Sequence, residues 1–274
     1  MAKHNEIAYI SNLNEHEVWH AVNKPFSDPN CGRYLVQLGT MISLLPPLPA
    51  RLLDLGCGTG WTSQFFARAG YDVVGIDIAP AMIELADESR DKAGLKNLMF
   101  KSSDYESLEF SNEFDCAVFF DSLHHADDEG LALRRVCAAL KPGGICVASE
   151  PGRGHHASEN TRKAVERHGV NEKDMPPEHV IRLARQAGFR KFRVFPHAAE
   201  LSRVVYTQRR DGVEEPFAAV DVDPLPRRNR SFVTRVWGRV ARVWRHEAHP
   251  PWRMGQIEHL LRYIRHSGLV LLQK

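Results

Sequence analysis

The sequence predicts an α/β protein: a doubly wound, mostly parallel seven-stranded sheet with helices on both faces, an N-terminal helical cap, and an insertion before the last strand. From Arg51 onward, short apolar segments of strand type alternate with segments of helical spacing. A glycine-rich turn, LLDLGCGTG at 52–60, joins the first strand to the first helix. A long, less regular region at about 197–265 precedes a final apolar segment. Strands that alternate with helices favour a parallel sheet covered on both faces.

The composition is that of a globular protein without a dominant charge. The chain has 274 residues, of which 43% are hydrophobic and 26% are charged, and its formal net charge is +2. This charge creates no overall field that would recruit nucleic acid or a membrane. No apolar run approaches the roughly 18 residues that cross a bilayer, and the N-terminus lacks the apolar core of a secretion signal. Five cysteines without a C-x-x-C pair fit a reduced compartment, so we expect a cytoplasmic protein.

Residues 1–49 are expected to form the helical cap. The segment GRYLVQLGTMISLL, residues 32–45, carries apolar side chains at helical spacing. Three prolines follow at positions 46, 47 and 49, and they end the helix because proline cannot continue helical hydrogen bonding.

Residues 50–196 carry the alternating elements of the core. Pro80 and Gly94 bracket one predicted helix, acids at 127–129 suit the positive N-terminal end of another, and Gly188 ends a third. The KPGG segment at 141–144 is expected to form a turn. The expected strands are 51–56, 71–77, 97–104, 115–121, 145–150 and 190–195, and the expected helices are 62–70, 80–94, 127–140 and 176–189. The apolar segment at 267–274 predicts one more strand, which returns 266–274 to the core and leaves 197–265 as an insertion.

The glycine loop does not match either common phosphate-binding motif. Gly56, Gly58 and Gly60 are spaced G-x-G-x-G, whereas a dinucleotide fingerprint requires G-x-G-x-x-G and here has Trp61 at its last position. A P-loop would require a lysine that GTGWT lacks. Asp54 inside the motif would repel a pyrophosphate and attract an ammonium group. Glycine is expected in the loop because a Cβ would collide with the ligand.

Three acids at strand ends suggest the chemistry of that ligand. Asp54 suits an amine, and Asp77 at the end of the second strand suits the two hydroxyls of a ribose. Asp104, which ends the third strand, suits an exocyclic adenine amine. The ligand would therefore contain an amine, a ribose and an adenine without phosphate. S-adenosylmethionine (SAM) has these groups.

The ordered segments LLDLGCGTG, VVGIDIAPAMIELA, SSD, EFDCAVFFDSLHHADD and LKPGGICVASEP resemble class I, Rossmann-like SAM-dependent methyltransferases, in the style of type-11 methyltransferase domains. The resemblance covers roughly residues 50–196. It implies that SAM is the cofactor and that an N-terminal helix, with Lys24, Phe26 and Asp28 nearby, closes over it. The cofactor contacts that it implies are Asp54, Gly56, Cys57, Gly58 and Gly60 at the methionine end, Asp77 at the ribose, and Ile78, Ser103, Asp104 and Tyr105 around the adenine.

The stretch DSLHHAD follows the fourth strand, so Asp121, His124 and His125 should face the cofactor at the carboxyl ends of the strands. We count Asp121 among the cofactor contacts. If the acceptor is a hydroxyl, His125 or His124 has a suitable pKa for a general base. The alternative is that these imidazoles only order the loop.

The stretch SEPGRGHH follows the fifth strand and adds further candidates. Glu150 could accept a hydrogen bond from a substrate hydroxyl or amine and is counted as catalytic. Arg153 could hold a carboxylate or phosphate, and it is grouped with His155 and His156 as substrate-binding. Two histidine pairs raise the question of a metal, but neighbouring histidines do not point together, so no metal site is predicted.

Residues 227–245, RRNRSFVTRVWGRVARVWR, contain seven arginines and no acid. Phe232, Val236, Val240 and Val243 lie at helical spacing, which predicts a basic amphipathic helix. Such a helix packs on the core, docks at a membrane surface, or contacts an anionic partner. The sequence alone leaves these alternatives open.

These observations predict four units: a cap at 1–49, a SAM-binding core at 50–196, a substrate or docking subdomain at 197–265, and a last core strand at 266–274. The predicted function is SAM-dependent methylation, most simply at oxygen, of a small-molecule or saccharide-type acceptor. The alternatives are a nucleic-acid methyltransferase, made less favourable by the absence of an N-P-P-Y-like clamp, and a SAM-binding scaffold subunit without turnover. The cytoplasmic protein could also associate with a membrane surface through 227–245.

Overall fold

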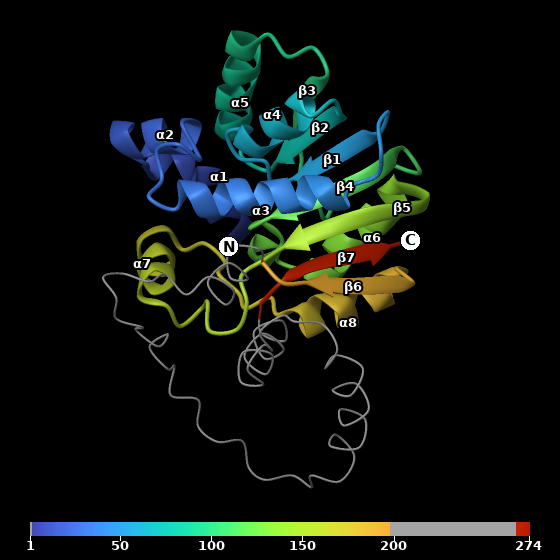
Figure 1. Ribbon diagram of the computed structural model, residues 1–274. Helices are drawn as coiled ribbons and strands as arrows, with labels where there is room; N and C mark the ends of the chain where they lie inside the picture. Colours follow the sequence, from blue (N-terminus) through green and yellow to red (C-terminus); the bar gives the residue numbers. More distant parts are fainter. Residues whose placement is uncertain (1, 198–266) are drawn as a thin grey trace, which may run out of the picture.

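The computed structural model describes residues 2–197 and 267–274, whose strands form one seven-stranded sheet (Figure 1). The strand order is β3-β2-β1-β4-β5-β7-β6, and β7 runs antiparallel to both of its neighbours while the pairs among β1 to β5 are parallel. This confirms the predicted doubly wound, mostly parallel sheet. The strands are β1 (Arg51–Leu55), β2 (Asp72–Asp77), β3 (Leu98–Ser102), β4 (Phe114–Phe120), β5 (Leu140–Ser149), β6 (Lys191–Phe195) and β7 (Leu269–Gln273).

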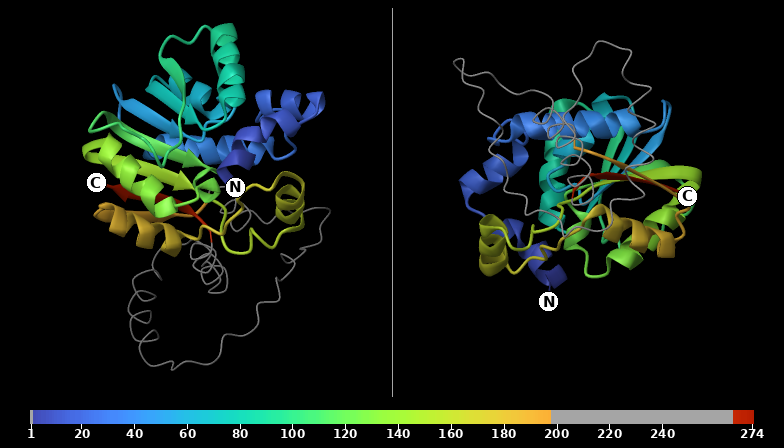
Figure 2. Two further views of the ribbon diagram at one scale, coloured as in Figure 1. Left: turned by 180° about the vertical axis from the view of Figure 1, so that it is seen from behind. Right: turned by 60° about the horizontal axis from the view of Figure 1, so that its bottom comes forward.

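Helices cover both faces of the sheet, as the two opposite views in Figures 1 and 2 show. One buried cluster joins α3, α4 and α5 to the sheet through residues such as Leu38, Phe66 and Ala86, and a second joins α6 and α8 through Leu133 and Val180. The helices are α1 (Ala2–Ala8), α2 (Glu15–Val22), α3 (Cys31–Leu44), α4 (Trp61–Arg68), α5 (Pro80–Ala93), α6 (Glu129–Ala139), α7 (Glu159–His168) and α8 (Pro177–Ala187), with short 3₁₀ turns η1 (Ile10–Asn12) and η2 (Leu123–His125). Strand residues alternate between these two clusters, so both faces of the sheet are buried.

The predicted turn at 141–144 lies inside β5. Leu140 pairs with Phe114, and the register shifts before the next pairs begin at Cys116. Gly143 has φ +79°, and a Cβ on Gly144 would lie 2.9 Å from the Lys141 carbonyl oxygen. The KPGG segment is therefore an irregularity within the strand, of the kind that an added residue produces in a ladder.

Helix α7 was not predicted, although its capping signals are present in the sequence. The Ser158 side chain accepts from the Thr161 backbone N–H at the N-terminus, and Gly169 ends the helix with φ +68°. The helix lies beside the N-terminal cap (Figure 1). The Asn5 amide donates to the Gly169 carbonyl at 2.9 Å, and Arg167 pairs with Glu17 at 2.7 Å. The cap is thus built by α1, α2 and α7 together.

The predicted insertion falls almost entirely outside the described residues, and so does the basic amphipathic helix predicted at 227–245. None of the helices in ranges 2–197 and 267–274 combines the length and apolar character that a membrane crossing requires.

The left-handed turn at Gly60 generates a prediction of stability. Gly60 has φ +77°, and a Cβ there would lie 2.4 Å from Cζ of Phe100, whereas Gly94 has φ +65° and open space around the same position. Both alanine variants incur left-handed strain of about 1–2 kcal/mol. Gly60→Ala should lose about 1–3 kcal/mol more than Gly94→Ala because it also overpacks the core. Urea unfolding measures both variants, and equal losses would contradict the packing at Phe100.

Candidate active site

The β1–α4 turn requires glycine at three places, for two different reasons. Gly56, Gly58 and Gly60 all have positive φ, between +53° and +77°. A Cβ on Gly56 would lie 2.5 Å from the Cβ of Ser122, so the Ser122 side chain leaves no room for it. Gly58 has no heavy atom within 4 Å of that position. We expected a bound ligand to leave no room for a Cβ in this loop. At Gly56 and Gly60 it is instead side chains of the protein, Ser122 and Phe100, that leave no room. Only Gly58 faces open space.

Asp77 holds this turn in place from the end of β2. One carboxylate oxygen accepts from the Gly58 N–H at 2.9 Å, and the other accepts from the Ala79 N–H at 3.0 Å. Burial raises the pKa of Asp77, and the two N–H groups oppose that rise. Each oxygen retains a lone pair, so the carboxylate can still accept from ribose hydroxyls. Ile78 lies half-buried beside it.

Asp54 occupies a different environment from the one expected. Its carboxylate is buried and accepts from the Thr62 hydroxyl at 2.8 Å and the Ser63 hydroxyl at 2.6 Å. Burial raises its pKa to about 6, although both hydroxyls oppose the rise. The side chain ties β1 to the first turn of α4. It stabilises the loop from behind and does not line the cavity described below.

Asp104 is already engaged by the cap. Lys3 of α1 contacts the Asp104 carboxylate at 2.5 Å and the buried Glu106 carboxylate at 2.6 Å. The other Asp104 oxygen accepts from the Glu106 N–H. The Ser103 N–H donates to the Asp77 carbonyl, and the Tyr105 hydroxyl donates to the Ser122 carbonyl at 2.9 Å. In this arrangement the segment 103–105 braces the strand ends and anchors α1.

One cavity of ≈ 530 Å³ lies between the glycine loop and the cap. The loop contributes Gly56 through Thr59, the end of β4 contributes Phe120 and Asp121, and the cap supplies most of the remaining wall. The other lining residues are Tyr9, Leu13, Glu17, His20, Ala21, Lys24, Tyr34, Trp61, Thr62, Met82, Lys163, Ala164, Arg167 and His168. Four of the predicted cofactor contacts line this space: Gly56, Cys57, Gly58 and Asp121. The other predicted contacts lie outside this lining: Asp54, Gly60, Asp77, Ile78, Ser103, Asp104 and Tyr105.

Asp121 carries strain at the cavity wall. Its φ is +49°, a left-handed conformation that non-glycine residues seldom adopt and that aspartate tolerates better than most. The Asp121 side chain is exposed and lines the cavity. Desolvation by the protein around it is the largest cause that raises its pKa to about 6, and repulsion from Glu150 adds to the rise. Backbone strain of this kind clusters at functional positions. Among the described residues, Asp121 and Glu17 are the two carboxylates that line the cavity.

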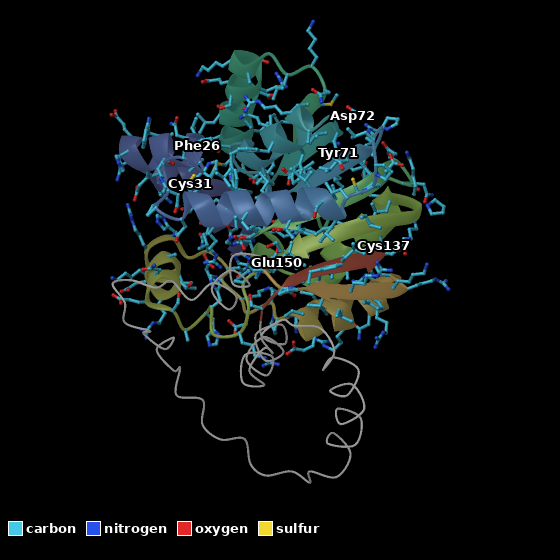
Figure 3. The ribbon with its side chains drawn as sticks, in the orientation of Figure 1. Phe26, Cys31, Tyr71, Asp72, Cys137 and Glu150 are labelled. Carbon is cyan, nitrogen blue, oxygen red and sulfur yellow. The ribbon has the colours of Figure 1, made fainter. Side chains whose placement is uncertain are left out.

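His124 and Glu150 form a buried network behind the cavity. Glu150 lies at the end of β5, near the centre of the molecule (Figure 3). It accepts from the backbone N–H groups of Ser122 and Leu123 and contacts His124 Nδ1 at 2.8 Å. Burial opposes a charge on His124, but the hydrogen bonds of Glu150 and Glu172 outweigh it and raise the pKa of His124 to about 10. Both side chains are fully engaged and act as positioning residues for the loop, in contrast to the catalytic roles expected.

His125 is half-buried, and its Nδ1 lies 2.7 Å from the carbonyl oxygen of Asn171. It does not line the cavity. The sequence-based choice of His125 as the base therefore has no support from its position.

The expected substrate-binding residues pair with acids outside the cavity. Arg153 forms an ion pair with Glu178, and His156 Nδ1 lies 3.0 Å from Asp174. His155 Nε2 lies 2.6 Å from Glu172. These contacts join the segment after β5 to α8 and to the segment before it.

Sequence reasoning predicted a cap over the site and named Lys24, which lines the cavity, but it missed His20. His20 lines the cavity from α2, and its Nε2 lies 3.5 Å from the Asp28 carboxylate. The Thr59 hydroxyl donates to the Ala21 carbonyl at 2.7 Å, which ties the glycine loop to α2. Tyr34 and Trp61 place their ring centroids 5.9 Å apart at the wall. The stretch WHAVNKPFSDP contained the His20 signal, but its partner Asp28 becomes evident only in the fold.

The strand order, the glycine loop and Asp77 define an α/β protein that binds a nucleoside-type ligand at the carboxyl ends of its strands. A sequence family described as "Methyltransferase domain" matches residues 49–193, which is more than half of the chain. The chain belongs to this methyltransferase family. Membership confirms the predicted class of protein, a SAM-dependent methyltransferase of class I fold.

A curated relative is named for the same class of activity, and solved structures share the fold. The ubiquinone biosynthesis O-methyltransferase of Azorhizobium caulinodans is 36% identical over 107 residues, which cover 39% of this chain and 42% of that protein. The chain thus matches less than half the length of this relative. The phosphoethanolamine N-methyltransferase 2 of Haemonchus contortus, crystallised with SAM, is 17% identical, with a TM-score of 0.61 over 98% of this chain and 59% of its own. The cyclase SpnF has a TM-score of 0.50 at 20% identity, over 89% and 81% of the two chains.

Asp77→Ala should weaken SAM binding by about 1.5–3 kcal/mol, roughly tenfold to 150-fold in Kd, because a buried charged acceptor is lost. Isothermal titration calorimetry measures this change. Asp72→Ala is the matched control, since Asp72 is the exposed residue at the opposite end of β2. Equal affinity of the two variants would exclude Asp77 from the cofactor site.

The pKa of Asp121 predicts a pH dependence of binding. If its carboxylate faces the SAM ammonium, affinity should fall by up to about tenfold as the pH decreases from 7 to 5, because protonation near pH 6 removes the negative charge. Asp121→Asn should have weaker affinity and a flatter pH profile. If Asp121→Asn kept the wild-type pH profile, another group would cause the pH dependence. Asp54 would be the first candidate, because its pKa is also raised to about 6.

Proposed function

We propose that this protein transfers the methyl group of SAM to a hydroxyl group of a small molecule, releasing S-adenosylhomocysteine. The observation that carries the proposal is the ≈ 530 Å³ cavity bounded by the glycine loop on one side and by the cap on the other. Its volume is typical of small-molecule sites. The relative named for O-methylation supports oxygen as the methylated atom.

We place the cofactor along the strand ends. The ribose lies at Asp77, the methionine end along the Gly56–Gly58 backbone, and the ammonium at Asp121, the strained carboxylate of the wall. Asp54 keeps the turn rigid from behind. These positions are those expected from the sequence motifs, except that Asp121 and not Asp54 faces the ammonium.

We place the acceptor on the cap side, against aromatic side chains. Tyr34, Trp61 and Phe120 form a cluster with centroid distances of 5.2 to 6.2 Å. Lys24 lies 5.8 Å from the Tyr34 ring centroid and also lines the cavity. Flat aromatic walls with a cation at the edge suit a planar acceptor that carries a hydroxyl.

His20 is the base in this proposal. It lies on the cavity wall, and its Nε2 is 3.5 Å from the Asp28 carboxylate, which is near enough to orient the ring. The base takes the hydroxyl proton while the oxygen attacks the methyl carbon and the sulfonium leaves as a neutral thioether. Because SAM is already activated, the remaining task of the protein is alignment of oxygen, carbon and sulfur.

His20→Gln should reduce turnover by about 10²- to 10⁴-fold and leave SAM affinity near that of the wild type, because the variant removes only the base. The matched control is His16→Gln, an exposed histidine of the same helix that does not line the cavity. Transfer of radiolabelled methyl to the acceptor measures turnover. Equal effects in both variants would show that His20 is not the base.

The acceptor class is tested with methyl-labelled SAM added to an extract that lacks the protein, followed by separation into lipid, saccharide, nucleic-acid and small-molecule fractions. Label in the small-molecule fraction, carried as an O-methyl group, supports the proposal. Label in the nucleic-acid or saccharide fraction would show that the proposed acceptor class is wrong. Bound SAM with no label in any fraction would favour a scaffold role.

A further inference from the structure

A cluster of histidines and carboxylates lies next to the cavity and takes no part in the proposed reaction. Its centre consists of His124, His125 and Glu172, and the surrounding groups include Glu150 and His155. We define the first three as the histidine–glutamate centre. One ring nitrogen of each histidine and one carboxylate oxygen of Glu172 all lie within 4.8 Å of one another.

We infer that the histidine–glutamate centre binds a divalent transition-metal ion. Metal bonds to imidazole and carboxylate are about 2.0–2.2 Å long, so ligand atoms in a tetrahedral site lie roughly 3.3 Å apart. His124 Nε2 already lies 3.5 Å from the Glu172 Oε2 atom. Because no two of the three ligand atoms are more than 4.8 Å apart, each pair would have to approach by about 1.5 Å at most to bind one ion.

The adjacent histidines converge, which the sequence analysis excluded. The 3₁₀ turn η2 carries both side chains, and their ring centroids are 4.0 Å apart with planes inclined by 40°. The turn thus brings the two tilted rings together, and one nitrogen of each lies within 4.8 Å of the other, so neighbouring residues can supply two ligands to one ion.

Neighbouring oxygen and nitrogen atoms hold each side chain of the histidine–glutamate centre in a fixed orientation. Nδ1 of His124 contacts the Glu150 carboxylate at 2.8 Å, and Nδ1 of His125 contacts the Asn171 carbonyl at 2.7 Å. Each Nδ1 thus faces an oxygen, which is the usual outer arrangement of metal-bound histidine. The Nε2 of His124 faces Glu172, so an ion bound between these two atoms would displace the proton that they share. His155 Nε2 holds the carboxylate of Glu172 at 2.6 Å.

The local charge favours a cation. Three carboxylates surround the histidines: Glu150, Glu172 and Glu6, the last with an oxygen 3.4 Å from His125 Nδ1. Within the described parts of the chain, no lysine or arginine pairs with any of them. A divalent ion would compensate for these charges in a buried setting, where uncompensated charge is unfavourable.

The site would join three distant segments of the chain. Its ligands come from the turn after β4 and from the segment before α8, and Glu6 adds α1 of the cap. The same turn follows Asp121 directly, so an ion would rigidify the loop at the cavity wall. Two imidazoles and one carboxylate suit Zn²⁺ and related first-row ions better than Mg²⁺ or Ca²⁺.

The test uses the full-length protein, free of affinity tags and stripped with a chelator. Titration with Zn²⁺ in a calorimeter and with Co²⁺ in a spectrophotometer should show one saturable equivalent, with the intense visible bands of four- or five-coordinate Co²⁺. His125→Ala and the isosteric Glu172→Gln should each weaken binding at least about tenfold, as loss of one metal ligand does.

His156→Gln is the matched control, because it removes an exposed imidazole that pairs with Asp174 and leaves the centre intact. It should bind like the wild type. Circular dichroism checks that all variants are folded. Absence of saturable binding, or wild-type binding by folded Glu172→Gln, would overturn the inference and leave the cluster held by hydrogen bonds alone. The readouts do not involve methyl transfer, so they are independent of the proposed function.

Discussion

The turn between β1 and α4 is the constraint on which the rest of the site depends. Three residues of this turn adopt left-handed backbone, and the Asp77 carboxylate fixes it by accepting from the Gly58 N–H. Side chains from β3 and from the loop after β4 fill the spaces where two of the glycines lack a Cβ. The turn therefore sets the distance between three strand ends. Only Gly58 remains open, and the cavity lies beside it.

Long-range polar contacts from the cap close that cavity. Lys3 bridges Asp104 and Glu106, Arg167 pairs with Glu17, and the Thr59 hydroxyl reaches the Ala21 carbonyl. Several of these pairs are partly exposed, and exposed ion pairs contribute little to stability. A cap attached in this way can separate from the core more readily than the sheet can unfold, which suits entry of a cofactor and an acceptor.

The fold and the reaction are separate conclusions. A cyclase shares the fold at 20% identity, so strand order alone does not specify methyl transfer. The reaction that we propose depends on groups that line the cavity: the open glycine, the strained Asp121, the aromatic wall and His20. Glu150 illustrates the difference. Its four hydrogen bonds to three successive residues, 122–124, make it the support of the loop that follows Asp121.

The sequence by itself determined the sheet, its helices, the glycine turn and the importance of Asp77, because strand and helix periods and turn glycines are properties of neighbouring residues. It also indicated the class of ligand. Only the tertiary structure decided what each polar side chain contacts. Lys3 reaches Asp104 across 101 positions, and Arg153 meets Glu178 across 25. The convergence of His124, His125 and Glu172 likewise requires the folded chain. Partners so far apart leave no local pattern, since the sheet that joins them forms only when its core is buried.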